Sequence, residues 1–154
     1  MPDRPDFKIR LLHFWFLMSR PMTLGVRALA FDDEGRVLLV RHTYVPGWHL
    51  PGGGVETGHT VTETLAKELH EEANVILAAP PRLVSVHLND RVTRRDHVVV
   101  FRCDQVTQTA PKQRDLEIIE AEFFPVDGLP PEITRSSRNR IDESLGLAPP
   151  DPYW

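Results

Sequence analysis

Short apolar runs alternate with turn-forming residues over most of the chain, and this pattern predicts several β-strands. The first two runs cover residues 24–31 and 37–41, and the acidic, glycine-ended segment between them predicts a turn that joins them as a hairpin. The next segment, residues 44–58, is rich in Gly and Pro and is expected to be a loop. Further strands are expected at residues 82–88, 97–104 and 117–125.

Residues 60–73 have the period of an amphipathic helix. Its apolar stripe consists of Val61, Leu65 and Leu69. Thr60, with Glu63 three residues later, forms a capping-box pattern at the start. Asn74 follows the last turn, where a residue in the left-handed conformation often ends a helix.

The order of these elements predicts one mixed α/β domain over residues 21–148, with helices flanking a sheet and a second helix near residues 132–145. Residues 149–154 contain three prolines and are expected to form an irregular tail. Residues 1–20 are expected to form a helical extension. Its apolar core, residues 11–18, is shorter than the roughly 20 residues of a membrane span and lacks a signal-peptidase pattern. We therefore expect this helix to pack on the domain or at a homodimer contact.

Composition narrows the functional classes. The 154 residues include 22 acidic and 18 basic side chains, so the net charge is −4, and no basic stripe with interleaved aromatic residues suggests nucleic-acid binding. The one cysteine, Cys103, cannot form an intramolecular disulfide. It is expected to be a buried strand residue in a cytoplasmic protein.

Three glutamates crowd the C-terminal end of the predicted 60–73 helix. Glu68, Glu71 and Glu72 fall within about 100° of arc, so they repel one another and oppose the helix dipole. An exposed acidic face is one interpretation. A site for divalent cations is the other, since hard cations bind carboxylate oxygens and relieve the repulsion.

A glycine-rich loop precedes this helix and favours the second interpretation. Gly52, Gly53 and Gly54 have no side chains to keep the backbone away from a ligand. A loop of this kind, followed by clustered carboxylates, could place phosphate oxygens beside bound Mg²⁺.

Residues 53–75 resemble the signature of the Nudix hydrolase family: Gly, five residues, Glu, seven residues, then Arg-Glu-apolar-x-Glu-Glu-x-Gly-apolar. Gly53 and the three glutamates match the pattern. His59 stands in place of the first Glu, Lys67 in place of Arg, and Asn74 in place of the second Gly. His59 replaces an anion with a mostly neutral ring, and Lys67 lacks the planar fork of Arg. We expect both to support the site, with the glutamates less rigidly oriented by Lys67 and the activity tuned by His59. The alternative is that His59 itself reaches the metal or a phosphate.

The resemblance implies a Nudix-like α/β/α sandwich with a mixed sheet between helices. It also implies hydrolysis of a pyrophosphate bond in a small nucleotide-type substrate: a nucleoside triphosphate, ADP-ribose or a nucleotide sugar. The implied cofactor is Mg²⁺, with Mn²⁺ as an alternative. Glu68 and Glu72 are the expected metal ligands, and Glu71 is expected to be a ligand or the general base. The alternative is a Nudix-like nucleotide-binding or regulatory domain with weakened catalysis.

Other candidates lie outside the signature. Glu120 and Glu122 share a face of one predicted strand and could add a ligand or a base. Phosphate or base contacts could come from residues before the signature, namely Arg27, Arg41, His42, Tyr44 and Trp48. A zinc site is disfavoured, because the spacing of the remaining candidates is not compact. These candidates are His87, Asp96 and His97.

Overall fold

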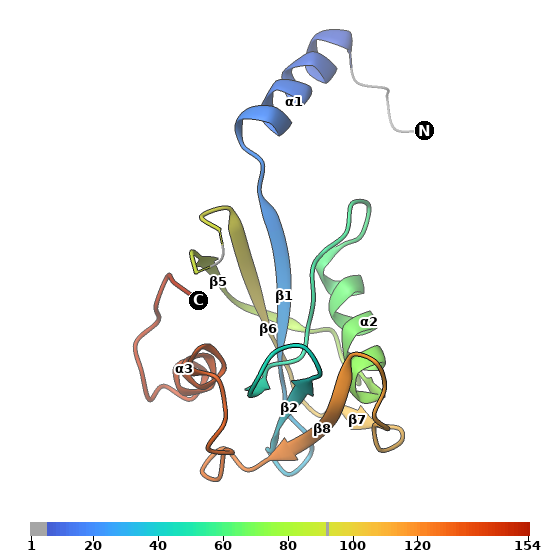
Figure 1. The fold of residues 1–154 in the computed structure, drawn as a ribbon, viewed down its shortest axis with the longest axis vertical. Coiled ribbons are helices and arrows are strands. Elements are labelled where there is room, and N and C mark those ends of the chain that lie inside the picture. Colours follow the sequence, from blue (N-terminus) through green and yellow to red (C-terminus); the bar gives the residue numbers. More distant parts are fainter. Residues whose placement is uncertain (1–5, 92) are drawn as a thin grey trace.

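Two three-stranded sheets form the centre of the computed structural model, which describes residues 6–91 and 93–154 (Figure 1). The first sheet has the order β1-β6-β5. Its strands are β1 (Thr23–Ala30), β6 (Asp96–Cys103) and β5 (Arg82–Asn89). β1 runs parallel to β6, and β6 runs antiparallel to β5, so this sheet is mixed as expected.

The second sheet has the order β3-β2-β8 and is antiparallel. Its strands are β2 (Val37–His42), β3 (Trp48–His49) and β8 (Ile118–Phe124). The loop expected at residues 44–58 therefore contains one two-residue strand. A small pair, β4 (Val75–Ile76) and β7 (Thr107–Gln108), completes the sheets.

The predicted hairpin of the first two strands is wrong, although its turn is present. The Asp32 carboxylate accepts hydrogen bonds from the backbone N–H groups of Glu34 and Arg36. Beyond this turn, one bridge pairs Phe31 with Val37, and the two strands then enter different sheets. The local hydrogen bonds of Asp32 therefore make the chain turn, but β1 pairs with the distant strand β6 and β2 pairs with the distant strand β8.

Helices α2 (Val61–Ala73) and α3 (Arg135–Ser144) lie on opposite sides of the sheets in Figure 1, and each covers its own apolar cluster. Leu65 and Leu69 of α2 pack with Val26 and other residues of one cluster, whereas Ile141 of α3 belongs to the second. This arrangement confirms the α/β/α sandwich.

Local signals set the ends of α2. The Thr60 hydroxyl accepts a hydrogen bond from the Glu63 N–H, and the Glu63 carboxylate accepts one from the Thr60 N–H. Asn74 is left-handed with φ 53° and closes the other end through its N–H and the His70 carbonyl. Both predicted caps are confirmed, as is the burial of Cys103 in β6.

The N-terminal helix α1 (Phe7–Ser19) buries none of its side chains and stands clear of the sheets in Figure 1. The expectation that it packs on its own domain is therefore wrong. Residues 1–5 of the predicted extension lie outside the described residues. Among the helices of residues 6–91 and 93–154, none has the length and apolar character needed to cross a membrane.

The C-terminal tail is irregular, as expected, but it is held against the domain. The Trp154 N–H donates to the Leu88 carbonyl of β5, and the fully buried Arg140 donates to the Tyr153 carbonyl at 2.8 Å. Arg140 also forms an ion pair with Glu143 at 2.6 Å. A buried charge thus fixes α3 and the tail to the first sheet.

Replacing Arg140 with Ala should lower the free energy of unfolding by about 3–5 kcal/mol, because it leaves Glu143 without its partner. Urea denaturation measures this change. Arg138→Ala is the matched control, since Arg138 lies on the same helix but is exposed, and should change stability by less than about 0.5 kcal/mol. Equal effects of the two variants would contradict this role for Arg140.

Candidate functional site

The C-terminal half of α2 borders a pocket of about 410 Å³. One wall carries Glu68, Glu71 and Glu72, and the other is residues 115–118 at the start of β8. The structure therefore places the three predicted glutamates at one pocket and adds a wall that the sequence did not indicate.

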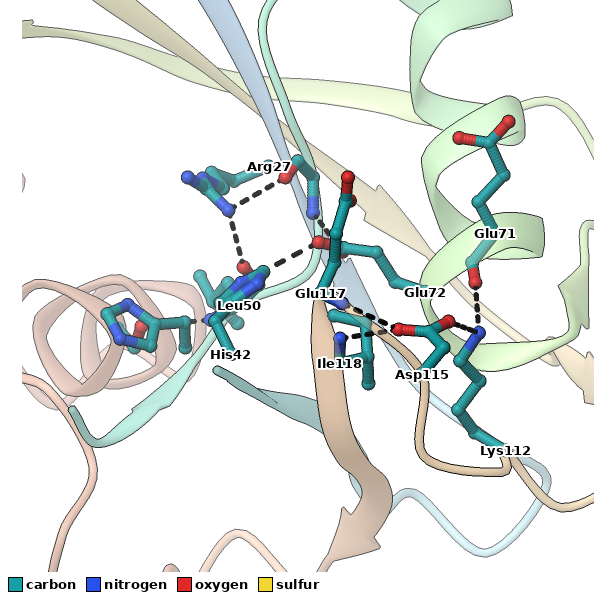
Figure 2. A network of polar contacts seen from close by, with 12 residues as sticks. Arg27, His42, Leu50, Glu71, Glu72, Lys112, Asp115, Glu117 and Ile118 are labelled. Carbon is teal, nitrogen blue, oxygen red and sulfur yellow. Dashed lines mark hydrogen bonds and ion pairs between the residues drawn. The ribbon is translucent and has the colours of Figure 1, made fainter. Parts of the chain in front are cut away.

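Glu72 is the most constrained of these carboxylates. Its side chain is buried, one oxygen accepts a hydrogen bond from the Gly52 N–H at 2.8 Å, and the other lies 3.6 Å from His42 Nε2 (Figure 2). Burial raises its pKa to about 7, although the Gly52 hydrogen bond and the charge of Arg27 oppose this shift. The carboxylate can therefore exchange a proton near neutral pH.

Arg27 fixes the loop that bonds to Glu72. Its guanidinium donates to the carbonyl oxygens of Leu50 and Gly52 at 3.1 and 2.9 Å (Figure 2). The same loop runs beside β1, where the Val26 N–H donates to the Gly53 carbonyl. Arg27, which the sequence suggested as a phosphate contact, therefore orients the loop.

The three consecutive glycines have different structural roles. Gly52 has φ 145°, and a Cβ there would lie 2.0 Å from the Val26 carbonyl oxygen, so only glycine fits. At Gly53 a Cβ would lie 2.7 Å from the Glu68 carboxyl group, whereas at Gly54 it would meet nothing within 4 Å. Gly53 thus provides the space that Glu68 occupies.

Glu68 is partly buried, with its carboxyl group next to Gly53 of this loop. Burial is the main cause that raises the pKa of its carboxyl group, and the neighbouring Glu71 charge adds to it. The charge of Lys67 acts in the opposite direction. The surroundings of Glu68 and Glu72 therefore disfavour the charged form of both carboxyl groups. A bound cation would favour the charged form again.

Glu71 is more exposed than the other two. Its carboxylate lies 3.9 Å from Lys67 Nζ and points away from the Glu72 carboxylate in Figure 2. Its backbone carbonyl accepts a hydrogen bond from Lys112, which also pairs with Asp115 at 2.6 Å. This contact, together with the N–H groups of residues 117 and 118, lowers the pKa of Asp115 to about 2 and joins the two pocket walls.

Sequence reasoning missed Glu117. It lines the pocket opposite Glu72, and its charge contributes to the raised pKa of Glu72 (Figure 2). The suggested strand carboxylates lie elsewhere, since Glu120 pairs with Arg41 at 2.8 Å and Glu122 is exposed. The position of Glu117 depends on how β8 pairs with β2, which no local pattern encodes.

A larger pocket of about 770 Å³ lies beside His42. Arg41, Tyr44 and Thr134 are among the residues lining it. Trp48 does not line it, because its ring is buried against Phe124 with a centroid separation of 4.8 Å. Arg41 thus lines the pocket while its guanidinium pairs with Glu120 and lies 5.6 Å from the centre of the Trp48 ring.

The residues that depart from the signature remain at the surface. The His59 side chain is exposed, and its backbone N–H donates to the Glu56 carbonyl oxygen. The side chain of Lys67 is half-exposed. The disfavoured zinc candidates have other contacts: His87 with Asp151 and Ser85, and Asp96 with Thr23.

Magnesium suits these carboxylates even without a closed cage. Among residues 6–91 and 93–154, no three Asp, Glu, His or Cys side chains converge into a ready metal site. Mg²⁺ usually keeps several waters and takes one or two protein carboxylates together with substrate phosphates. Glu68 and Glu72, with raised pKa values and a side-chain-free loop beside them, provide that kind of donor set.

The chain is similar to known proteins in sequence and in fold. A family model described as the NUDIX domain matches residues 21–144. An RNA pyrophosphohydrolase of Halorhodospira halophila is 36% identical over 46% of this chain and 42% of its own length. The putative ADP-ribose pyrophosphatase YjhB of Bacillus subtilis is 34% identical over 69% of this chain and 51% of its own.

The chain therefore spans about half the length of these curated relatives. Among solved structures, an ADP-ribose pyrophosphatase from Streptococcus suis superposes with a TM-score of 0.61 at 26% identity. That match covers 80% of this chain and 91% of the other.

The raised pKa of Glu72 predicts a pH dependence of stability in the metal-free protein. At pH values between 4.5, the ordinary pKa of a glutamate, and about 7, Glu72 keeps a proton in the folded protein that it loses in the unfolded chain. The contribution of Glu72 to the free energy of unfolding should therefore fall as pH rises through this window, by up to about 3 kcal/mol. His42, whose pKa burial lowers to about 4, contributes with the opposite sign.

Glu72→Gln should lack this component. Urea denaturation of both proteins in the presence of a chelator, across the window, measures it as the difference between wild type and variant. A difference that does not change with pH would contradict the shift.

Proposed function

The chain belongs to the Nudix family, and on that premise we propose that it hydrolyses a pyrophosphate bond, with Mg²⁺, in a nucleoside diphosphate joined to a second group. The observation that carries this proposal is the paired placement of Glu68 and Glu72 against the glycine loop. Two carboxylates held in partly dry surroundings are unfavourable unless a cation or a proton compensates them.

Glu68 and Glu72 would hold the metal, and Glu117 would add a carboxylate from the opposite wall. When bound, Mg²⁺ would counter the phosphate charge and lower the pKa of a water molecule. Glu71 is the third signature carboxylate and the more exposed one, so it is suited to accept a proton from water in the open part of the pocket. His59 and Lys67 would tune the charge around these groups.

The glycine loop would bind the phosphates through its backbone. Gly53 and Gly54 present no side chains, and Arg27 fixes the loop through the carbonyl oxygens of Leu50 and Gly52. A rigid loop holds its N–H groups in place before substrate arrives, which lowers the cost of ordering on binding.

The 770 Å³ pocket beside His42 would receive the group attached to the pyrophosphate. Tyr44 offers a ring for stacking and Arg41 a positive charge. The names of two matched proteins make ADP-ribose the first compound to test. Nucleoside triphosphates, nucleotide sugars and 5′-triphosphorylated RNA are the comparison set, the last because another relative is an RNA pyrophosphohydrolase.

Glu72→Gln should reduce Mg²⁺-dependent kcat/KM by about 100-fold or more, because it removes both the charge and the ionisable group. The rate is measured by chromatographic detection of the nucleoside monophosphate that is released. Glu117→Gln, just before β8, should also lose activity, whereas Glu122→Gln, at an exposed position on β8, should retain it.

Unchanged turnover in Glu72→Gln would remove α2 from the mechanism. If the wild type turned over none of these compounds yet bound nucleotide tightly, the hydrolase proposal would fail in favour of a binding domain.

A further inference from the structure

Helix α1 is mostly apolar without a distinct polar face, and none of its side chains is buried by residues 6–91 and 93–154. Its exposed apolar residues comprise Phe7, Ile9, Leu11, Phe14, Trp15 and Leu17, among others. A helix that is apolar all round is normally buried, and 13 residues are marginal for an isolated helix in water. Its stability therefore calls for a surface that the described part of the chain does not supply.

The first sheet offers a matching surface at its β5 edge. Leu83 pairs with Phe101 and Val86 pairs with Val99, so both lie on the face that α2 covers over β1. At β5 this cover is missing, and Leu83 and Val86 are 58% and 51% exposed. An apolar strand edge left open in this way is a site for association.

We propose that α1 of one copy of this chain packs on the α2-side face of β5 in a second copy, and that the second copy does the same in return. Such an exchange has twofold symmetry, so both unpartnered surfaces are buried at once. The inference is independent of the proposed catalytic activity, since neither surface contains a residue of the pocket.

The surface area is sufficient for a stable dimer. If four large side chains of α1 are covered, at about 100 Å² each, and the receiving face loses a similar area, each exchange buries about 800 Å². Two exchanges bury about 1,600 Å², which is the standard size of a specific interface.

Two other occupants fit less well. A membrane-surface helix has a polar face opposite its apolar one, and α1 has none. Folding back onto its own sheet would require a reversal within residues 20–22, where Pro21 restricts the backbone, and α1 points away from that sheet in Figure 1.

Crosslinking between two differently tagged full-length chains tests the exchange. One chain carries Phe14→Cys and the other Val86→Cys, and after co-expression a short bismaleimide is added. The native Cys103 is buried and should react slowly. We expect a crosslinked product that contains one chain of each tag, whereas pairing Phe14→Cys with Glu34→Cys, on the distant turn, should give none.

Sedimentation provides the second measurement. The wild type should have twice the 17.6 kDa chain mass. Val86→Glu should raise the dimer dissociation constant by at least about 30-fold, with an unchanged circular dichroism spectrum because Val86 is exposed.

A monomeric wild type, or a dimer unaffected by Val86→Glu, would overturn the proposal. So would a crosslink formed within a single chain that carries both cysteines and is absent between chains. Monomers that bind phosphatidylglycerol vesicles through α1 would assign the helix to a membrane surface instead.

Discussion

The site depends on one hydrogen bond, from the Gly52 N–H to the buried carboxylate of Glu72. It joins the glycine loop to α2 and partly compensates a charge that burial disfavours. Arg27 strengthens this arrangement from β1, since its guanidinium binds two carbonyl oxygens of the same loop. Loop, helix and sheet are therefore held in register by polar contacts at the point where the proposed chemistry needs them.

The two-sheet architecture explains why the pocket has a second wall. β8 pairs with β2 in the sheet next to α2, so the residues that precede it face the glutamates across the pocket. Lys112 ties the two walls together through the Glu71 carbonyl and the Asp115 carboxylate. The pocket is thus acidic on both sides, which suits cations that lie between the protein and an anionic substrate.

The sequence predicted what local interactions determine. The caps of α2 at Thr60 and Asn74, and the crowding of Glu68 with Glu72, follow from spacing along one helix. The pairing of β1 with β6, the place of Glu117 and the docking of the tail by Arg140 depend on contacts between residues far apart in the chain. The sequence also did not predict that α1 lies apart from its own domain, because an apolar helix has the same sequence pattern whichever surface it packs on.

In the proposed function, the absence of a side chain at Gly53 leaves the space in which Glu68 would hold a cation beside the loop. Binding of Mn²⁺, measured by electron paramagnetic resonance for Gly53→Ala and Gly54→Ala, tests this most directly. A Cβ at Gly53 would displace the Glu68 carboxyl group, whereas one at Gly54 meets nothing within 4 Å. We expect an affinity loss of about 10-fold or more for Gly53→Ala alone. Equal affinities of the two variants would contradict it.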